Sequence, residues 1–178
     1  MNTFIFADSQ SCIGCRTCEV ACVVSHQAAN TVNAIDSASF TPRLQLVRNA
    51  EVTVPVMCRQ CEDAPCAQVC PNKAIYREDN QIKVQQEKCI GCKTCAIACP
   101  YGAMQIVTKS TAKGTGLLTV KETRAEAIKC DLCSDNPKGP ACVRVCPTGA
   151  LRIETAADVE QANARKRDAA ALAVADVI

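Results

Sequence analysis

Cysteine is the residue type whose number and spacing in this sequence could do chemistry. The chain has sixteen cysteines in 178 residues but only one histidine. The cysteines fall into four groups of four, and every group begins with C-x2-C and ends with C-x3-C. The groups are Cys12, Cys15, Cys18 and Cys22; Cys58, Cys61, Cys66 and Cys70; Cys89, Cys92, Cys95 and Cys99; and Cys130, Cys133, Cys142 and Cys146. Any metal bound here would therefore be held almost purely by thiolates.

The spacing within the groups indicates iron–sulfur cluster binding. The first and third groups read C-x2-C-x2-C-x3-C, and the other two lengthen only the middle gap. Proline follows the last cysteine in three groups, at Pro71, Pro100 and Pro147. This is the run of bacterial ferredoxins, in which three cysteines bind one [4Fe–4S] cluster and the fourth binds the other cluster of a pair. Gly14 and Gly91 would let the backbone approach the inorganic sulfides closely.

Zinc and disulfide bonds are two other uses of so many cysteines. A zinc site of four cysteines usually takes two C-x2–4-C pairs from separate loops, whereas here a third cysteine follows within three residues of the second, in two of the groups. Disulfide scaffolds are typical of short secreted chains. Residues 1–8 show no basic region, apolar stretch or small-residue cleavage site of a secretory signal. We therefore expect a cytoplasmic iron–sulfur protein, with zinc as a lesser alternative.

The gaps between the groups indicate how the clusters pair. The second and third groups are separated by 18 residues, against 35 before them and 30 after them. The short gap predicts a hairpin of strands 74–77 and 82–84, which makes residues 57–107 a two-cluster unit. The first and fourth groups would then pair around it, with strands 4–6 and 150–153 joining the two ends of the chain. Sequential pairing, of the first group with the second and the third with the fourth, is the competing topology.

If the two groups of each pair exchange their fourth cysteines, the sequence predicts four cluster sites. Three cysteines of one group are completed by the last cysteine of the paired group. We name each set after the first of its three: the Cys12 set (Cys12, Cys15, Cys18, Cys146), the Cys58 set (Cys58, Cys61, Cys66, Cys99), the Cys89 set (Cys89, Cys92, Cys95, Cys70) and the Cys130 set (Cys130, Cys133, Cys142, Cys22). No cysteine is left over to act as a nucleophile.

These expectations define a fold class. We predict an α+β protein of two interleaved 2[4Fe–4S] ferredoxin-like lobes, with short helices, small antiparallel hairpins and a C-terminal helix. The predicted outer lobe is residues 1–56 with 108–154, the inner lobe is residues 57–107, and the C-terminal helix or tail is residues 155–178. Thr155, with Asp158 three residues later, is typical of a capping box at the start of that helix.

The segments between the groups carry weaker signals. Residues 44–47 and 52–56 are strand-like, and residues 28–39 are predicted to form a surface loop. The Gly, Ser and Thr content of residues 109–116 indicates a flexible connection. The basic run 165–167 is expected to be a solvated helix face. His26 is expected to be a polar residue near the first cluster rather than a ligand, because all four sites already have four thiolates.

The cysteine segments resemble a known family. Residues 12–22, 58–71, 89–103 and 129–142 are similar to the four-cluster electron-transfer subunits of molybdopterin oxidoreductases, from dimethyl sulfoxide reductase to nitrate reductase and formate dehydrogenase. The short length and the segment from Cys22 to His26 are most similar to the small electron-transfer subunit of formate hydrogenlyase and its accessory paralogue. The resemblance covers residues 3–154. It implies pairing of the first motif with the fourth and the second with the third, and four complete [4Fe–4S] clusters.

The resemblance also implies a function. The chain would relay single electrons between a molybdopterin-dependent catalytic subunit, with formate dehydrogenase favoured, and a hydrogenase or another redox partner. It would be non-catalytic, and either free in the cytoplasm or bound to the cytoplasmic face of a membrane complex. The alternative is an accessory protein for the maturation or assembly of formate dehydrogenase or hydrogenase.

Composition excludes several other classes. Twenty Lys and Arg against eighteen Asp and Glu give a net charge of +2, without the strong basic field that binds nucleic acid. No apolar run reaches the roughly 18 residues of a membrane helix, so direct membrane insertion is not expected. Five aromatic residues make a thin hydrophobic core, which we expect the inorganic clusters to supplement.

Overall fold

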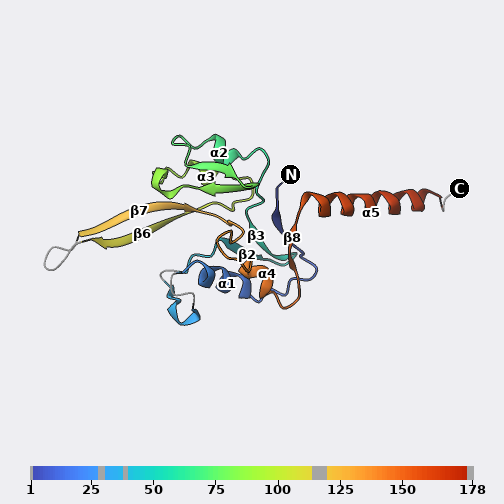
Figure 1. The fold of residues 1–178 in the computed structure, drawn as a ribbon. Helices are drawn as coiled ribbons and strands as arrows, with labels where there is room; N and C mark the ends of the chain where they lie inside the picture. The colour runs from blue at the N-terminus through green and yellow to red at the C-terminus, as the bar shows by residue number, and fades with distance from the viewer. Residues whose placement is uncertain (1, 28–30, 38–39, 114–119, 176–178) are drawn as a thin grey trace.

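The computed structural model describes residues 2–27, 31–37, 40–113 and 120–175. In these ranges the strands pair into antiparallel two-stranded sheets, and short helices lie between them (Figure 1). The paired strands are β1 (Phe4–Ala7) with β8 (Leu151–Glu154), β2 (Leu44–Arg48) with β3 (Thr53–Met57), β4 (Ile75–Glu78) with β5 (Gln81–Val84), and β6 (Gln105–Lys113) with β7 (Val120–Ile128). The helices are α1 (Thr17–Ser25), α2 (Pro65–Gln68), α3 (Thr94–Ala98), α4 (Ala141–Arg144) and α5 (Ala156–Ala175), with 3-10 turns η1 (Val32–Ala34) and η3 (Gln86–Lys88). The α+β class is confirmed.

The first and last strands of the cysteine-bearing region pair with each other. β1 and β8 run antiparallel, with Ile5 opposite Ile153, and the side chain of Ile5 is buried. The predicted pairing of strands 4–6 and 150–153 is therefore confirmed. This pairing brings the first cysteine group near the fourth, because α1 follows β1 and α4 precedes β8, and the two helices pack together.

The short gap between the second and third groups forms the predicted hairpin. β4 and β5 pair with Ile75 opposite Val84. Asp79 and Asn80 form the turn, both with positive φ (49° and 59°). Two central residues with positive φ are the signature of a tight hairpin turn, and Asp and Asn tolerate that conformation. The turn is thus two residues long, shorter than the four-residue turn that the sequence suggests.

The hairpin of β6 and β7 corrects one prediction. Residues 109–113 are strand rather than flexible connection, because Lys109 pairs with Arg124 and Lys113 with Val120. Threonine and other β-branched residues favour strands, so the Thr-containing run extends a ladder that begins at Gln105. The ribbon projects from the rest of the molecule (Figure 1). The glycine-containing part of the predicted connection, residues 114–116, lies outside the described residues, as does part of the predicted loop 28–39.

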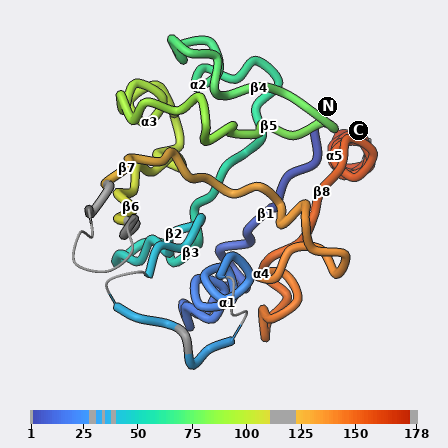
Figure 2. Tube along the Cα trace, turned by 60° about the vertical axis from the view of Figure 1, so that its left-hand side comes forward, coloured from blue at the N-terminus to red at the C-terminus, as the bar shows by residue number. Residues whose placement is uncertain are grey.

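The buried side chains of the described residues form two cores. In Figure 2 the elements around the second, α2, α3, β4 and β5, lie above α1, α4, β2 and β3 of the first. One core lies among β1, α1, β2, β3, α4 and β8, and four of its buried members are cysteines: Cys18, Cys22, Cys130 and Cys142. The other lies among α2, β4, β5 and α3 and includes Cys95, Ile75, Ile82 and Met104. Ala127, near the end of β7, packs in this second core. The chain from β7 to the fourth cysteine group therefore crosses from one core to the other.

The C-terminal helix is confirmed, and it starts with the predicted capping box. The backbone N–H of Thr155 donates to Asp158 Oδ2 at 2.8 Å, and the N–H of Asp158 reaches Thr155 Oγ1 at 3.4 Å. α5 extends away from both cores (Figure 1). Residues 165–167 are exposed, as expected, and Arg167 pairs with Glu160 at 2.6 Å. Of the described helices, none is long and apolar enough to cross a membrane.

Candidate metal centres

The cysteine loops curl through residues in the left-handed conformation. Gly14 and Arg16 have φ of 70° and 62°, and the equivalent Gly91 and Lys93 both have φ of 68°. A Cβ on Gly14 would lie 2.8 Å from Thr53 Cγ2, and one on Gly91 would overlap Ala125 Cβ. Gly14 therefore lies close against β3, and Gly91 lies close against β7. This close packing is a reason for glycine that is separate from the approach to sulfide suggested by the sequence.

Gly91→Ala is expected to destabilise the protein by roughly 1–3 kcal/mol beyond the cost of the left-handed backbone, because the new methyl overlaps Ala125. Gly102→Ala is the matched control. Gly102 also has positive φ (59°), but no atom lies within 4 Å of its would-be Cβ. Anaerobic denaturant unfolding of the two variants measures the difference between them. Equal losses of unfolding free energy would show that the contact with β7 does not matter.

Three pockets are each lined by four cysteines. Their cysteine linings are Cys12, Cys15, Cys18 and Cys146; Cys58, Cys61, Cys66 and Cys99; and Cys70, Cys89, Cys92 and Cys95. The structure thus brings together the members of the Cys12, Cys58 and Cys89 sets. The remaining lining is largely apolar, with Leu46 and Leu151 in the first pocket, Met104 in the second and Ile106 in the third.

The members of the Cys130 set lie in and beside the first core, where α1 packs against α4. Cys22, Cys130 and Cys142 are buried there, and Cys133 is partly exposed. Burial raises the pKa of the Cys142 thiol, and the nearby charges of Cys130, Cys22 and Cys133 raise it further. The Cys130 set is therefore also brought together, by packing of helices that are far apart in the sequence.

The thiol pKa values show what a bound group would have to supply. Burial raises the pKa of Cys18 and of Cys66 to about 11, and that of Cys130 to about 12. Hydrogen bonds from Thr17 and Thr94 instead lower the pKa of Cys15 and Cys92. Metal ligation requires the thiolate, so the buried positions need a cationic centre to hold their negative charge. Four thiols in an apolar pocket fit the donor set of a [4Fe–4S] cluster.

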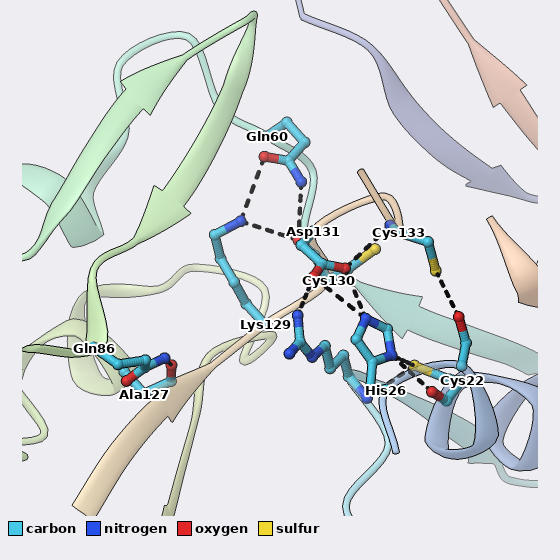
Figure 3. A network of polar contacts seen from close by, with 11 residues as sticks. Cys22, His26, Gln60, Gln86, Ala127, Lys129, Cys130, Asp131 and Cys133 are labelled. Carbon is cyan, nitrogen blue, oxygen red and sulfur yellow. Dashed lines mark hydrogen bonds and ion pairs between the residues drawn. The ribbon is translucent and has the colours of Figure 1, made fainter. Parts of the chain in front are cut away.

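His26 is a partly buried polar residue that contacts the last cysteine of the first group and Asp131 of the fourth group. Its Nδ1 lies 2.7 Å from the carbonyl oxygen of Cys22, and its Nε2 lies 3.1 Å from Asp131 Oδ1 (Figure 3). Arg43 also pairs with Asp131, and the N–H of Arg43 donates to Cys22 Sγ at 3.3 Å. The last cysteine of the first group faces the fourth group, which brings His26 to Asp131.

The protonation of this network is set by its contacts. Burial lowers the pKa of His26, but hydrogen bonds with Asp131 and Cys22 outweigh it and raise the value to about 10. Burial raises the pKa of Asp131, but His26 and Arg43 lower it to about 2. The imidazolium and the carboxylate therefore form an ion pair that ties α1 to the fourth cysteine group. Sequence reasoning gave no role to Asp131, although its place between two cysteines is a signal that it lies close to a cluster.

Two further buried polar residues, Gln60 and Lys129, were also not singled out by sequence reasoning. Their side chains meet between the two cores (Figure 3). Gln60 lies between two cysteines of the second group, and Lys129 immediately precedes the fourth. A long polar side chain next to a ligand cysteine is the signal that could have identified them.

Comparison with known proteins agrees with this geometry. Residues 50–156 match the sequence model of the 4Fe-4S dicluster domain, and residues 9–24 match that of a 4Fe-4S binding domain. The chain belongs to the 4Fe-4S dicluster family. This dicluster protein binds iron–sulfur clusters, and the resemblance to ferredoxin-type subunits is confirmed.

Relatives of this dicluster protein match over nearly its whole length. It is 50% identical to the electron transport protein HydN of Escherichia coli, over 97% of this chain and 99% of that protein. It is 46% identical to the putative electron transport protein YsaA of the same organism, over 94% of this chain and 99% of that protein. It is also 40% identical to formate hydrogenlyase subunit 2 of E. coli, over 94% of this chain and 89% of that protein.

Proposed function

We propose that the chain is an electron-transfer subunit that relays single electrons through four [4Fe–4S] clusters, one in each cysteine set. The observation that carries this proposal is that three pockets are each lined by one complete predicted set. The chain is an iron–sulfur electron carrier without catalytic chemistry of its own, in keeping with relatives named for electron transport. A bound cluster supplies reversible one-electron oxidation and reduction.

The four sets are proposed to form one chain of redox sites, in the order Cys12, Cys130, Cys58 and Cys89. Cys18 lies close enough to Cys142 for their charges to interact, so the Cys12 set adjoins the Cys130 set. Cys130 interacts in the same way with Cys58. The Cys58 and Cys89 sets share the packed pair of helices α2 and α3.

The two ends of this order are where electrons would enter and leave. Cys15 in the Cys12 set and Cys92 in the Cys89 set are exposed, whereas three of the four members of the Cys130 set are buried. Exposed isoleucines stand beside both ends, at Ile13 and Ile90. The protein's own residues hold the thiolates, keep water from the central sites and leave one edge of each end site open to a partner.

The proposed partners are a molybdopterin-dependent catalytic subunit, with formate dehydrogenase favoured, and a hydrogenase or another acceptor. Similarity to formate hydrogenlyase subunit 2 supports this pairing. The proposed location is the cytoplasm, free or on the cytoplasmic face of a membrane complex. Each of the two predicted lobes would face one partner. The outer lobe is residues 1–56 with 108–154, and the inner lobe is residues 57–107.

Formate should reduce the clusters only when a formate dehydrogenase is present. The purified chain is mixed anaerobically with formate and the enzyme, and the visible absorbance of its iron–sulfur clusters is followed. We expect bleaching with both components and none when either is omitted. A chain that binds the enzyme but stays oxidised with this and every other donor would contradict the relay and favour an accessory role in assembly.

A further inference from the structure

A buried lysine lies between the inner and outer redox sites. Lys129 follows β7 and directly precedes Cys130, and its exposed fraction is 4%. Its side chain also lines the pocket of the Cys58 set, together with Ile82 and Met104. One residue therefore adjoins the ligands of two neighbouring sites in the proposed order.

The ammonium group is held by neutral oxygens. Lys129 Nζ donates to the carbonyl oxygen of Cys130 at 3.0 Å and to Gln60 Oε1 at 3.5 Å. Among the described residues, no ion pair of Lys129 with a carboxylate is found. The nearest acidic residue in the sequence, Asp131, is already engaged by His26 and Arg43. The positive charge of Lys129 is thus not cancelled by a partner within its own network.

Gln60 fixes this arrangement and is itself 1% exposed. Its Nε2 donates to the carbonyl oxygen of Cys130 at 2.9 Å, and its Oε1 accepts from the backbone N–H of Ile82 at 2.8 Å. Its backbone has positive φ, 52°. Gln60 therefore bridges the second cysteine group, strand β5 and the fourth cysteine group, and it leaves the lysine little freedom to move.

We propose that Lys129 is a positioning residue that makes the site of the Cys58 set easier to reduce. This inference rests on the proposed function. A [4Fe–4S] cluster with four thiolates carries about −2 when oxidised and about −3 when reduced. A fixed positive charge stabilises the more negative form more strongly, and poor solvation in the interior increases the effect. The electron that the site accepts comes from the adjacent cluster in the relay, which loses it, and no bond is made or broken.

A buried cation has a clear use at this position. Neither the Cys130 set nor the Cys58 set has an exposed cysteine, so an electron that crosses between them enters a site largely screened from solvent. Lys129 lowers the free energy of the extra negative charge there. The Cys58 set is therefore expected to have a higher reduction potential than it would with an apolar neighbour.

The test is an EPR-monitored redox titration of the full cluster-loaded chain, purified anaerobically. Lys129→Met nearly keeps the length of the side chain but removes the charge. In this variant the midpoint potential of one cluster should fall by at least 59 mV, which for one electron is a tenfold change in equilibrium constant. Lys129→Arg should keep the native value. Lys138→Met, at an exposed lysine of the same cysteine group, should also keep it. The shifted signal is assigned with Cys66→Ser, which alters the cluster of the Cys58 set.

Unchanged potentials in iron-replete Lys129→Met would overturn the inference. If that variant loses iron, Lys129→Gln decides, because its neutral amide can still donate a hydrogen bond to the carbonyl oxygen of Cys130 while the charge is removed. The same potential should then fall, and an unchanged value would again overturn the inference. Iron content and the number of reducible clusters in the native chain report separately on the proposed relay, so failure of one proposal is distinguishable from failure of the other.

Discussion

Removal of iron is expected to unfold most of residues 2–154. The first core takes four of its buried members from cysteines, Cys18, Cys22, Cys130 and Cys142, and the sheets are isolated two-stranded pairs. Such pairs are marginally stable alone. Each cluster joins segments that are distant in the sequence, and the free energy of metal binding becomes folding free energy when the unfolded chain has no preformed site.

The expected result is loss of the near-UV circular dichroism and of most of the far-UV signal after anaerobic chelation. Residual helical signal should come from α5, which is alanine-rich, capped and separate from both cores. Hydrogen exchange resolves the two parts, because protection should vanish from β1 to β8. An apoprotein that keeps native circular dichroism and protection would contradict this expectation.

Loss of a central ligand is expected to divide the relay. Cys142→Ala removes a buried member of the Cys130 set, with an exposed fraction of 4%, and should leave about twelve irons per chain. The reduced protein should also lose the magnetic coupling that joins the Cys12 site to the inner pair. Iron analysis and EPR spectra of the fully reduced protein measure both effects.

Cys15→Ala is the matched control for this variant. Cys15 is an exposed member of the Cys12 set at the end of the proposed order. Its loss should also remove about four irons but should leave the coupling among the Cys130, Cys58 and Cys89 sites intact. Indistinguishable EPR spectra for the two variants would contradict the proposed order.

The sequence predicted those features that depend on spacing and local chemistry. A gap of 18 residues between Cys70 and Cys89 is too short for much besides a hairpin, and β4 and β5 form it. The Thr155 capping box needs only neighbours in the sequence, and it forms as expected. The four cysteine sets were proposed from the same reasoning, and the structure places the members of each set close together.

The features that sequence reasoning missed depend on contacts between distant segments. His26 contacts Asp131 across more than a hundred residues, and Gln60 reaches Lys129 across 69. Spacing within one motif carries no information about such contacts. The strand at Lys109 was missed for another reason: composition rich in Ser, Thr and Gly describes both loops and the ends of long hairpins, and only the partner strand β7 decides between them.

The number of clusters per chain is the most direct test of the relay. The protein is purified anaerobically, and iron, acid-labile sulfide and zinc are measured together with the unpaired spins of the dithionite-reduced sample. We expect about sixteen irons and sixteen sulfides per chain and about four spins, with negligible zinc. About eight irons, or zinc in stoichiometric amount with little iron, would contradict the relay.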